Sequence, residues 1–263
     1  MPIIPIDDAD DPRVAAYRDV RERDLVGREG LFIAEGEVVV RVLLGPRSRH
    51  APVSLLLAEK RAAGLAARAD TAAVPVYVAG QAVFDRIAGF HIHRGILALG
   101  RRAPIETAEG VLASLGSRAV VVVLSAIANH DNMGGICRNA AAFSTAAVIL
   151  DGDCCDPFYR KAIRVSVGGA LTLRFARVAT VGDGLDALVA RGFTTLALSP
   201  SGTGVLTGVV RPDRVAAAFG AEGPGIAPEV LARTRTVRIA MAGGMDSLNV
   251  ATASGIVLHH LKQ

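Results

Sequence analysis

Two groups of residues near the end of the chain have types and spacing suited to gripping a small ligand. The first is Gly220-Ala-Glu222-Gly-Pro-Gly225, in which three glycines surround one carboxylate. Glycine accepts positive φ angles and lets backbone N–H groups approach a ligand closely. The second is Asp246-Ser247-Leu248-Asn249, ahead of an alanine-rich helical pattern that Ser247 or Asn249 can cap. Neither G-x-G-x-x-G after a strand nor G-x-x-x-x-G-K-[ST] occurs, so the common nucleotide-binding fingerprints do not explain these glycines.

A third group, Asn129-His-Asp-Asn132 followed by Arg138, opens a helical pattern after an apolar run. Asn132 stands where a helix N-cap is expected. Arg138 comes less than two turns later, so the spacing alone does not place both side chains on one face. An N-capped amphipathic helix with an ordinary surface arginine explains this segment equally well.

A fourth group is the basic cluster Arg160, Lys161 and Arg164, next to Tyr159. Like charges at i,i+3 and i,i+4 repel one another unless an anion or a partner relieves them. The cluster therefore predicts contact with phosphate, and a solvated helix face is the alternative.

Composition narrows the class of protein. Hydrophobic residues make up 51% of the 263 residues and the mean hydropathy is +0.39, yet no apolar run is long enough to span a bilayer. The N-terminus lacks the basic and apolar regions of a signal peptide, so we expect a soluble, cytoplasmic protein. The net charge of +4 divides evenly between the two halves, without a polybasic tail.

The cysteines and histidines do not predict a metal centre. Cys137, Cys154 and Cys155 lack C-x-x-C spacing, so neither a disulfide framework nor a zinc site is expected. His91 and His93 stand two residues apart without a third ligand nearby. We therefore expect no metal.

The elements that must position these groups form two α/β alternations. A charged helix over 10–30 is followed by predicted strands at 31–34, 53–57, 74–78 and 95–99, with helices over 35–44, 59–69 and 81–88. The charged, proline-containing segment after Arg101 predicts a boundary that gives domains 1–102 and 103–263.

The second alternation begins with Ala119–Ser125, whose continuous apolarity is typical of a central parallel strand. Further strands are predicted over 146–150, 173–178, 194–199, 215–219 and 236–240, with helices over 132–143, 163–170, 184–191 and 247–261. This order predicts a mostly parallel sheet covered on both faces, with ligands bound beyond the carboxyl ends of its strands.

Together these motifs resemble the SpoU/TrmH class of the SPOUT superfamily, which are S-adenosylmethionine-dependent RNA ribose 2′-O-methyltransferases. Asn132 and Arg138 fit that family's N-x-G-x-x-x-R motif, Gly220–Gly225 its G-x-E-x-x-G motif, and Ser247–Val250 its S-L-N-V motif. Arg164-Val-Ser166-Val-Gly168 fits its R-x-S-x-G stretch, and the motifs cover most of 119–262. His130 departs from the family pattern, where proline is commoner, and this puts the rigidity of the loop in question.

The resemblance implies a C-terminal domain with a deep trefoil knot and a homodimer whose active sites are completed near the interface. Phe32-Ile-Ala-Glu35-Gly36 is similar to the opening of the family's L30e-like substrate-binding domain, which implies an RNA-binding role for the N-terminal domain. The implied cofactor is S-adenosylmethionine, and the resemblance implies that it is held by Ser199, Gly220, Glu222, Gly225, Ile239, Met241, Ser247 and Leu248. The implied catalytic residues are Arg138, Asn132, Glu222, Ser247 and Asn249.

The resemblance implies a structured RNA as substrate, since only RNA offers a 2′-hydroxyl, and the additional N-terminal domain favours ribosomal over transfer RNA. Arg160, Lys161 and Arg164 are the expected RNA contacts. Two alternatives stay open: a non-catalytic RNA-binding protein on the same scaffold, and a SPOUT enzyme that methylates a base. Loss of Arg138 or Asn249 would favour the first, and both residues are present.

Overall fold

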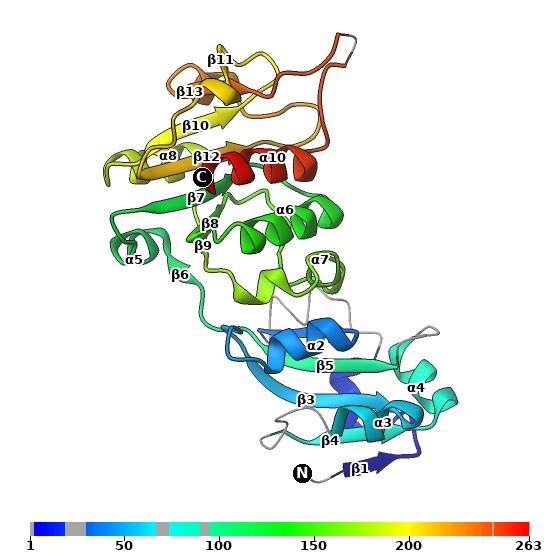
Figure 1. Ribbon diagram of the computed structural model, residues 1–263. Coiled ribbons are helices and arrows are strands. Elements are labelled where there is room, and N and C mark those ends of the chain that lie inside the picture. Colours follow the sequence, from blue (N-terminus) through cyan, green and yellow to red (C-terminus); the bar gives the residue numbers. More distant parts are fainter. Residues whose placement is uncertain (1–2, 19–29, 67–73, 90–94, 244, 263) are drawn as a thin grey trace. The chain divides into compact units, whose positions relative to one another are not determined.

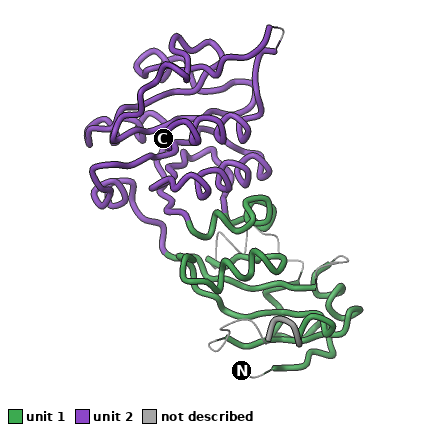
Figure 2. Tube along the Cα trace, viewed as in Figure 1, with its two compact units in different colours: residues 1–103, 158–172 green, residues 104–157, 173–263 purple. Residues whose placement is uncertain are grey.

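The computed structural model describes residues 3–18, 30–66, 74–89, 95–243 and 245–262. The chain divides into two compact units, the first made of 1–103 and 158–172 and the second of 104–157 and 173–263 (Figure 2). The boundary predicted after residue 102 lies one residue from the end of the first segment. Residues 158–172 were placed in the second domain by the sequence but pack with the first unit.

The first unit is built on a five-stranded mixed sheet with the order β1-β4-β3-β5-β2 (Figure 1). The pairs β1–β4 and β4–β3 are parallel, and β3–β5 and β5–β2 are antiparallel. Its elements up to residue 103 are β1 Ile3–Ile6, a 3₁₀ turn Pro12–Tyr17, β2 Leu31–Glu35, α2 Glu37–Leu44, β3 Ala51–Ala58, α3 Glu59–Ala66, β4 Val76–Ala79, α4 Gln81–Ala88 and β5 Ile96–Arg101. The predicted strands of this half are present, and α2, α3 and α4 lie within three of the predicted helix ranges. Strand β1 was not predicted.

Part of the predicted N-terminal region lies outside the described residues. The helix expected over 10–30 is a 3₁₀ turn at Pro12–Tyr17, and residues 19–29 are not described. His91 and His93 also lie outside the described residues. The prediction of a helix therefore fails for the part of that segment that the structure describes.

Helix α7 (Arg160–Val165) and the 3₁₀ turn Gly169–Thr172 belong to the first unit for two physical reasons. The Arg160 Nε donates to Glu35 Oε2 at 2.9 Å, and Glu35 is only 8% exposed. Gly168 lies so close to Val42 that a Cβ there would come within 3.0 Å of the valine Cβ. The helix predicted over 163–170 instead ends at Val165, because Val167 and Gly168 take φ angles of 54° and 79°.

The second unit is built on an eight-stranded sheet in which every pair is parallel, as the sequence predicted (Figure 1). The strand order is β11-β13-β10-β12-β7-β8-β9-β6. Its elements are β6 Glu106–Thr107, α5 Ala108–Ala113, β7 Ala119–Leu124, α6 His130–Ala142, β8 Ala147–Leu150, β9 Phe175–Arg177, α8 Val181–Val189, β10 Thr194–Leu198, β11 Gly204–Val205, a 3₁₀ turn Leu206–Gly208, β12 Arg214–Phe219, α9 Pro228–Leu231, β13 Arg235–Arg238 and α10 Val250–Lys262.

Helices cover both faces of this sheet. On one face, α5, α8 and α9 bury apolar side chains against Val121 and Val123 of β7 and their neighbours. Side chains alternate along a strand, so Val122 and Leu124 point to the opposite face, where α6 and α10 pack against each other and α10 contacts β12. The short elements β6, α5, β11 and α9 were not predicted, because two to six residues carry too little periodicity.

Candidate active site

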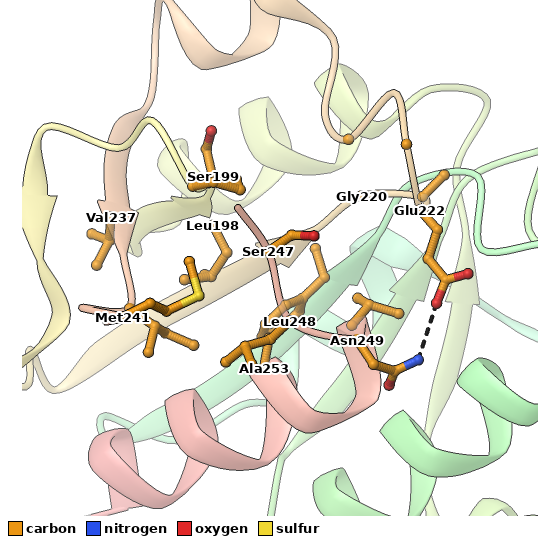
Figure 3. Close-up of a pocket in the computed structure, with 17 residues that line it drawn as sticks. Leu198, Ser199, Gly220, Glu222, Val237, Met241, Ser247, Leu248, Asn249 and Ala253 are labelled. Carbon is orange, nitrogen blue, oxygen red and sulfur yellow. Dashed lines mark hydrogen bonds between the residues drawn. The ribbon is translucent and has the colours of Figure 1, made fainter. Parts of the chain in front are cut away.

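A pocket of about 490 Å³ opens at the carboxyl ends of β12, β10 and β13 (Figure 3). Phe219 ends β12, Leu198 ends β10, and Ile239 follows β13. Strands of a parallel sheet present their carboxyl ends at one edge, and the strand order places these three next to one another. The remaining wall comes from the segment Ser247–Val250 and from Ala253 at the start of α10.

The glycine-rich turn forms one wall of this pocket. A Cβ on Gly220 would lie 2.2 Å from the carbonyl carbon of Gly225, so only glycine fits there. Gly223 and Gly225 have φ angles of 86° and 69°. The Gly225 N–H donates to the Ala221 carbonyl at 3.0 Å and closes the turn. The sequence correctly predicted that these glycines serve backbone geometry, and the structure shows that Gly220 is required by a backbone-to-backbone approach.

Asn249 connects three parts of the site through one amide side chain. Its Oδ1 accepts from the backbone N–H groups of Ala251 at 2.9 Å and Thr252 at 3.3 Å, and so caps α10. Its Nδ2 donates to Asn132 Oδ1 at 2.8 Å and to Glu222 Oε1 at 3.0 Å, the second bond being drawn in Figure 3. Both amide atoms are therefore engaged, and their partners fix which is the oxygen and which the nitrogen.

Asn132 lies inside the first turn of α6 rather than at its cap, which corrects the prediction. Asn129 is the N-cap, and its Oδ1 accepts from the N–H groups of Asp131 at 2.8 Å and Asn132 at 3.2 Å. This leaves the Asn132 side chain, 7% exposed, for the bond from Asn249. The Asn132 Nδ2 makes no hydrogen bond to a described residue.

Close packing of α6 on α10 brings Asn132 and Asn249 together. A Cβ on Gly135 would lie 2.6 Å from the Cβ of Ala251, so the helices approach nearly to backbone contact. Asn139 Nδ2 donates to the Ala251 carbonyl at 2.7 Å and to Ser254 Oγ at 3.0 Å. These contacts join segments that are more than 100 residues apart in sequence.

The structure brings all the predicted cofactor residues to one pocket. Those lining it are Ser199, Gly220, Glu222, Gly225, Ile239, Met241, Ser247 and Leu248. The structure adds residues that the sequence did not single out: Leu198, Pro200, Phe219, Ala221, Gly223, Val237, Val250 and Ala253. The signal that could have found several of them is their position at the carboxyl ends of predicted strands.

Arg138 is the one predicted catalytic residue that does not join this group within a single chain. It lies on the exposed side of α6, does not line the pocket, and has no bond or ion pair with the described part of the chain. Spacing alone did not determine the helix face of Arg138, and in the structure Arg138 lies on the side away from the buried Met133 and Cys137.

The predicted RNA contacts on α7 divide into two kinds. Arg160 Nε lies 2.9 Å and Arg164 NH1 3.4 Å from Glu35 Oε2, and the Arg160 side chain is only 17% exposed. Like-charge repulsion in the cluster is thus relieved by an internal carboxylate, in addition to the phosphate or solvent that the sequence indicated. Lys161 is exposed.

The described residues carry no obvious metal or redox centre. They contain no group of three or more His, Cys, Asp or Glu side chains able to hold a metal ion. Cys137, Cys154 and Cys155 are free thiols, and burial raises the pKa of Cys154 to about 12 and that of Cys155 to about 11. None of the helices in the described ranges is long and apolar enough to cross a membrane.

Comparison with known proteins gives consistent matches. A model of the SpoU rRNA Methylase family matches residues 119–259. A protein of Mycobacterium tuberculosis (strain ATCC 25618 / H37Rv), described as an uncharacterized tRNA/rRNA methyltransferase, is 40% identical over 96% of this chain and 89% of its own length. The 23S rRNA (guanosine-2'-O-)-methyltransferase RlmB of Acinetobacter baylyi is 28% identical over 73% of this chain and 79% of its own. The crystal structure of an AdoMet-bound rRNA methyltransferase from Sinorhizobium meliloti superposes with a TM-score of 0.82 at 22% identity, covering 99% of this chain and 97% of that one.

Proposed function

Since the chain belongs to the SpoU rRNA Methylase family, we propose that it transfers a methyl group from S-adenosylmethionine to a ribose 2′-hydroxyl of a structured RNA. The observation that carries the proposal is the network in which Asn249 bonds both Asn132 and Glu222 at the mouth of a pocket walled by a glycine turn. The name of the Acinetobacter baylyi relative, a ribosomal RNA guanosine-2'-O-methyltransferase, supports the ribose and favours ribosomal over transfer RNA.

The pocket residues fit S-adenosylmethionine in chemistry and size. Leu198, Val237 and Ile239 offer apolar surface, the Gly220–Gly225 turn offers backbone groups at close range, and Glu222 offers a carboxylate. A volume of about 490 Å³ lies within the range of small-molecule sites. When bound, this cofactor supplies an electrophilic methyl group, and the protein must align the acceptor oxygen with it.

The residues of the chain are suited to that alignment. Asn249 bonds the Asn132 Oδ1, and the Asn132 Nδ2, which makes no hydrogen bond within the described residues, is proposed to donate to a ribose or phosphate oxygen. Fixing the acceptor close to the reacting centre removes much of the entropic barrier to transfer. Ser247, on the pocket wall, offers a hydroxyl for the same purpose.

Arg138 is proposed to orient the phosphate and to stabilise the alkoxide that develops on the 2′-oxygen. An arginine is effectively always protonated, so electrostatic stabilisation suits it better than proton abstraction. Because Arg138 is exposed and away from the pocket of its own chain, we propose a homodimer in which each active site is completed near the interface. The exposed apolar side chains of Met245, Leu248 and Ile256, at 61%, 37% and 40%, support a covered surface there.

The remaining parts of the proposal concern architecture. We propose that the second unit contains the deep trefoil knot and that the first unit is an L30e-like RNA-binding domain in a cytoplasmic enzyme. The strand order supports the knot, since β12 lies between β7 and β10 while the later chain returns to place α10 against α6. The similarity of the whole chain to the Sinorhizobium meliloti structure supports both units.

Calorimetry with S-adenosylmethionine tests the cofactor assignment. The wild-type protein should bind it, and Gly220→Ala should weaken binding, because the added methyl group displaces the backbone of Gly225. Absence of binding by the wild-type protein would favour the non-catalytic alternative. Mapping ribose methylations in a gene-deletion strain against its parent should identify the nucleotide. A missing base methylation instead of a missing 2′-O-methyl group would favour the base-modifying alternative.

A further inference from the structure

We infer that Asp151 and Cys154 are positioning residues, which hold the loop between β7 and α6 and thereby fix Asn132 for methyl transfer. The inference rests on the proposed function for its link to catalysis. His130, and not a proline, stands at the first position of α6, so other contacts must restrain the loop before it. The loop spans residues 125–129 and is held by the segment that follows β8.

Asp151 secures the start of the loop. It is 4% exposed, and its Oδ1 and Oδ2 accept the Ala126 N–H at 3.0 and 3.1 Å. Oδ1 also accepts the Asp153 N–H at 3.2 Å, which orients the carboxylate. Ala126 has a φ of 53°, a left-handed conformation that an alanine adopts only when its surroundings impose it. The carboxylate bonds the N–H of the strained residue itself.

Cys154 secures the middle of the loop through a thiol that is bonded on both sides. It is 6% exposed, its Sγ donates to the Leu124 carbonyl at 3.4 Å, and it accepts the Ile127 N–H at 3.3 Å. The Cys155 N–H donates to the Ile127 carbonyl at 3.0 Å. Burial raises the pKa of the Cys154 thiol to about 12, so the thiol keeps its proton and can donate at neutral pH. The Asp151 N–H also donates to the Leu124 carbonyl at 3.1 Å, so six hydrogen-bond contacts from 151–155 reach 124–127.

The held loop leads directly to the catalytic group. Asn129 follows it and caps α6, and Asn132 lies in the first turn beyond. A proline at position 130 would restrict the backbone at the end of the same loop, because its φ is fixed near the helical value and it lacks only an N–H that a helix leaves unpaired there. Asn129, with φ −82° and ψ 123°, already has the extended backbone that precedes a proline. Asp151 and Cys154 therefore restrain residues 124–127 by hydrogen bonds, whereas a proline at position 130 would restrain the end of the loop covalently.

The test compares variants that differ in the bonds of the thiol. Cys154→Ala removes both bonds, whereas Cys154→Ser keeps a donor and an acceptor. Adding His130→Pro to Cys154→Ala should restore loop rigidity without restoring the thiol. Val111→Ala in α5, away from the loop, is a control for loss of core packing alone. Asp151→Ala removes the carboxylate that accepts the Ala126 N–H and tests the other positioning residue.

Three measurements follow each variant: kcat and KM with total RNA from a gene-deletion strain, S-adenosylmethionine affinity by calorimetry, and hydrogen exchange of peptides covering 124–132. Cys154→Ala should lower kcat about tenfold or more through misplacement of Asn132, leave cofactor affinity within about threefold, and speed exchange in the loop. Cys154→Ser and the His130→Pro double variant should recover most of both losses.

Wild-type kcat and unchanged loop exchange in Cys154→Ala would overturn the inference. So would an equal fall of kcat in Val111→Ala, because the effect would then report stability rather than positioning. If Asp151→Ala fails to fold, the Cys154 series decides the matter alone. A wild-type protein that methylates no RNA would refute the proposed function. Hydrogen exchange of the peptides covering 124–132 in the same variants would still show whether Asp151 and Cys154 restrain the loop.

Discussion

Replacing Asn249 separates its two roles, capping α10 and orienting Asn132 and Glu222. Asn249→Ser should keep the cap, because a serine hydroxyl accepts the same backbone N–H groups. The shorter side chain has no amide N–H groups to reach Asn132 and Glu222, which lie 2.8 and 3.0 Å from the present Nδ2. Asn249→Ala should lose both roles.

The size of each effect follows from the bonds that are lost. Two hydrogen bonds at about 1 kcal/mol each total about 2 kcal/mol, which corresponds to about thirtyfold in kcat if they act only on orientation. The lost cap in Asn249→Ala adds about 1 kcal/mol of instability, or about 2–4 °C in the Tm of a unit of this size. Asn249→Ser should therefore lose activity at nearly unchanged Tm.

The assay pairs thermal unfolding with methyl transfer to RNA from a gene-deletion strain. Thr180→Ala is the matched control, since Thr180 caps α8 through the Asp183 N–H at 3.2 Å and does not line the pocket. It should lower Tm as much as Asn249→Ala does while leaving kcat unchanged. Near-wild-type turnover by Asn249→Ser would refute the orienting role, and a large fall of its Tm would show that the cap had not been preserved.

Three further predictions test other parts of the molecule. Arg138→Ala should abolish methyl transfer and leave S-adenosylmethionine affinity within about fivefold, because Arg138 does not line the pocket; normal turnover would remove it from the mechanism. On α7, Lys161→Ala should weaken RNA binding and reduce the slope of log affinity against log salt concentration by about 1. Equal slopes for the wild type and Lys161→Ala would exclude a contact between Lys161 and RNA. Arg160→Ala should chiefly lower Tm, because it removes an ion-pair partner of the nearly buried Glu35. Burial and the neighbouring arginines lower the pKa of His50 from 6.5 to about 4. As the pH falls, the unfolded chain therefore protonates at His50 before the folded protein does. The free energy of unfolding should decrease as the pH drops from about 6.5 to 4. Unfolding of His50→Gln should show a flatter pH dependence over that window, and an unchanged slope would contradict this assignment.

The sequence predicted the fold class of the second unit and most of its strands. An uninterrupted run of apolar residues, such as Ala119–Ser125, indicates a strand that is buried on both faces of a sheet. It also placed the pocket glycines correctly, since glycine is chosen for local backbone geometry. Its errors fall where a residue's role depends on a partner far away in the chain. Asn132 was predicted to be a helix cap, but Asn129 takes that role and a contact from Asn249 sets the function of Asn132.

The α7 segment shows the same limit at the level of domains. Sequence order placed α7 in the second domain, whereas the bond from Arg160 to Glu35, 125 residues away, joins α7 to the first unit. The contact of Arg160 with RNA stays a prediction. Charge repulsion along a helix is visible in sequence, but the carboxylate that relieves it is not. The roles of Asp151 and Cys154 were hidden for the same reason, because hydrogen bonds to a loop 25 to 30 residues earlier have no local signature.

The sequence by itself determined the parallel sheet, the glycine turn and the family motifs, since each depends on residues close together along the chain. Only the tertiary structure decided that Glu222, Asn249 and Asn132 form one hydrogen-bonded network, that Arg138 faces away from it, and that α7 belongs with the N-terminal unit. The physical reason is that backbone preferences and hydrophobic periodicity act locally, whereas side-chain hydrogen bonds are selected by whichever groups the folded strands and helices bring within about 3 Å.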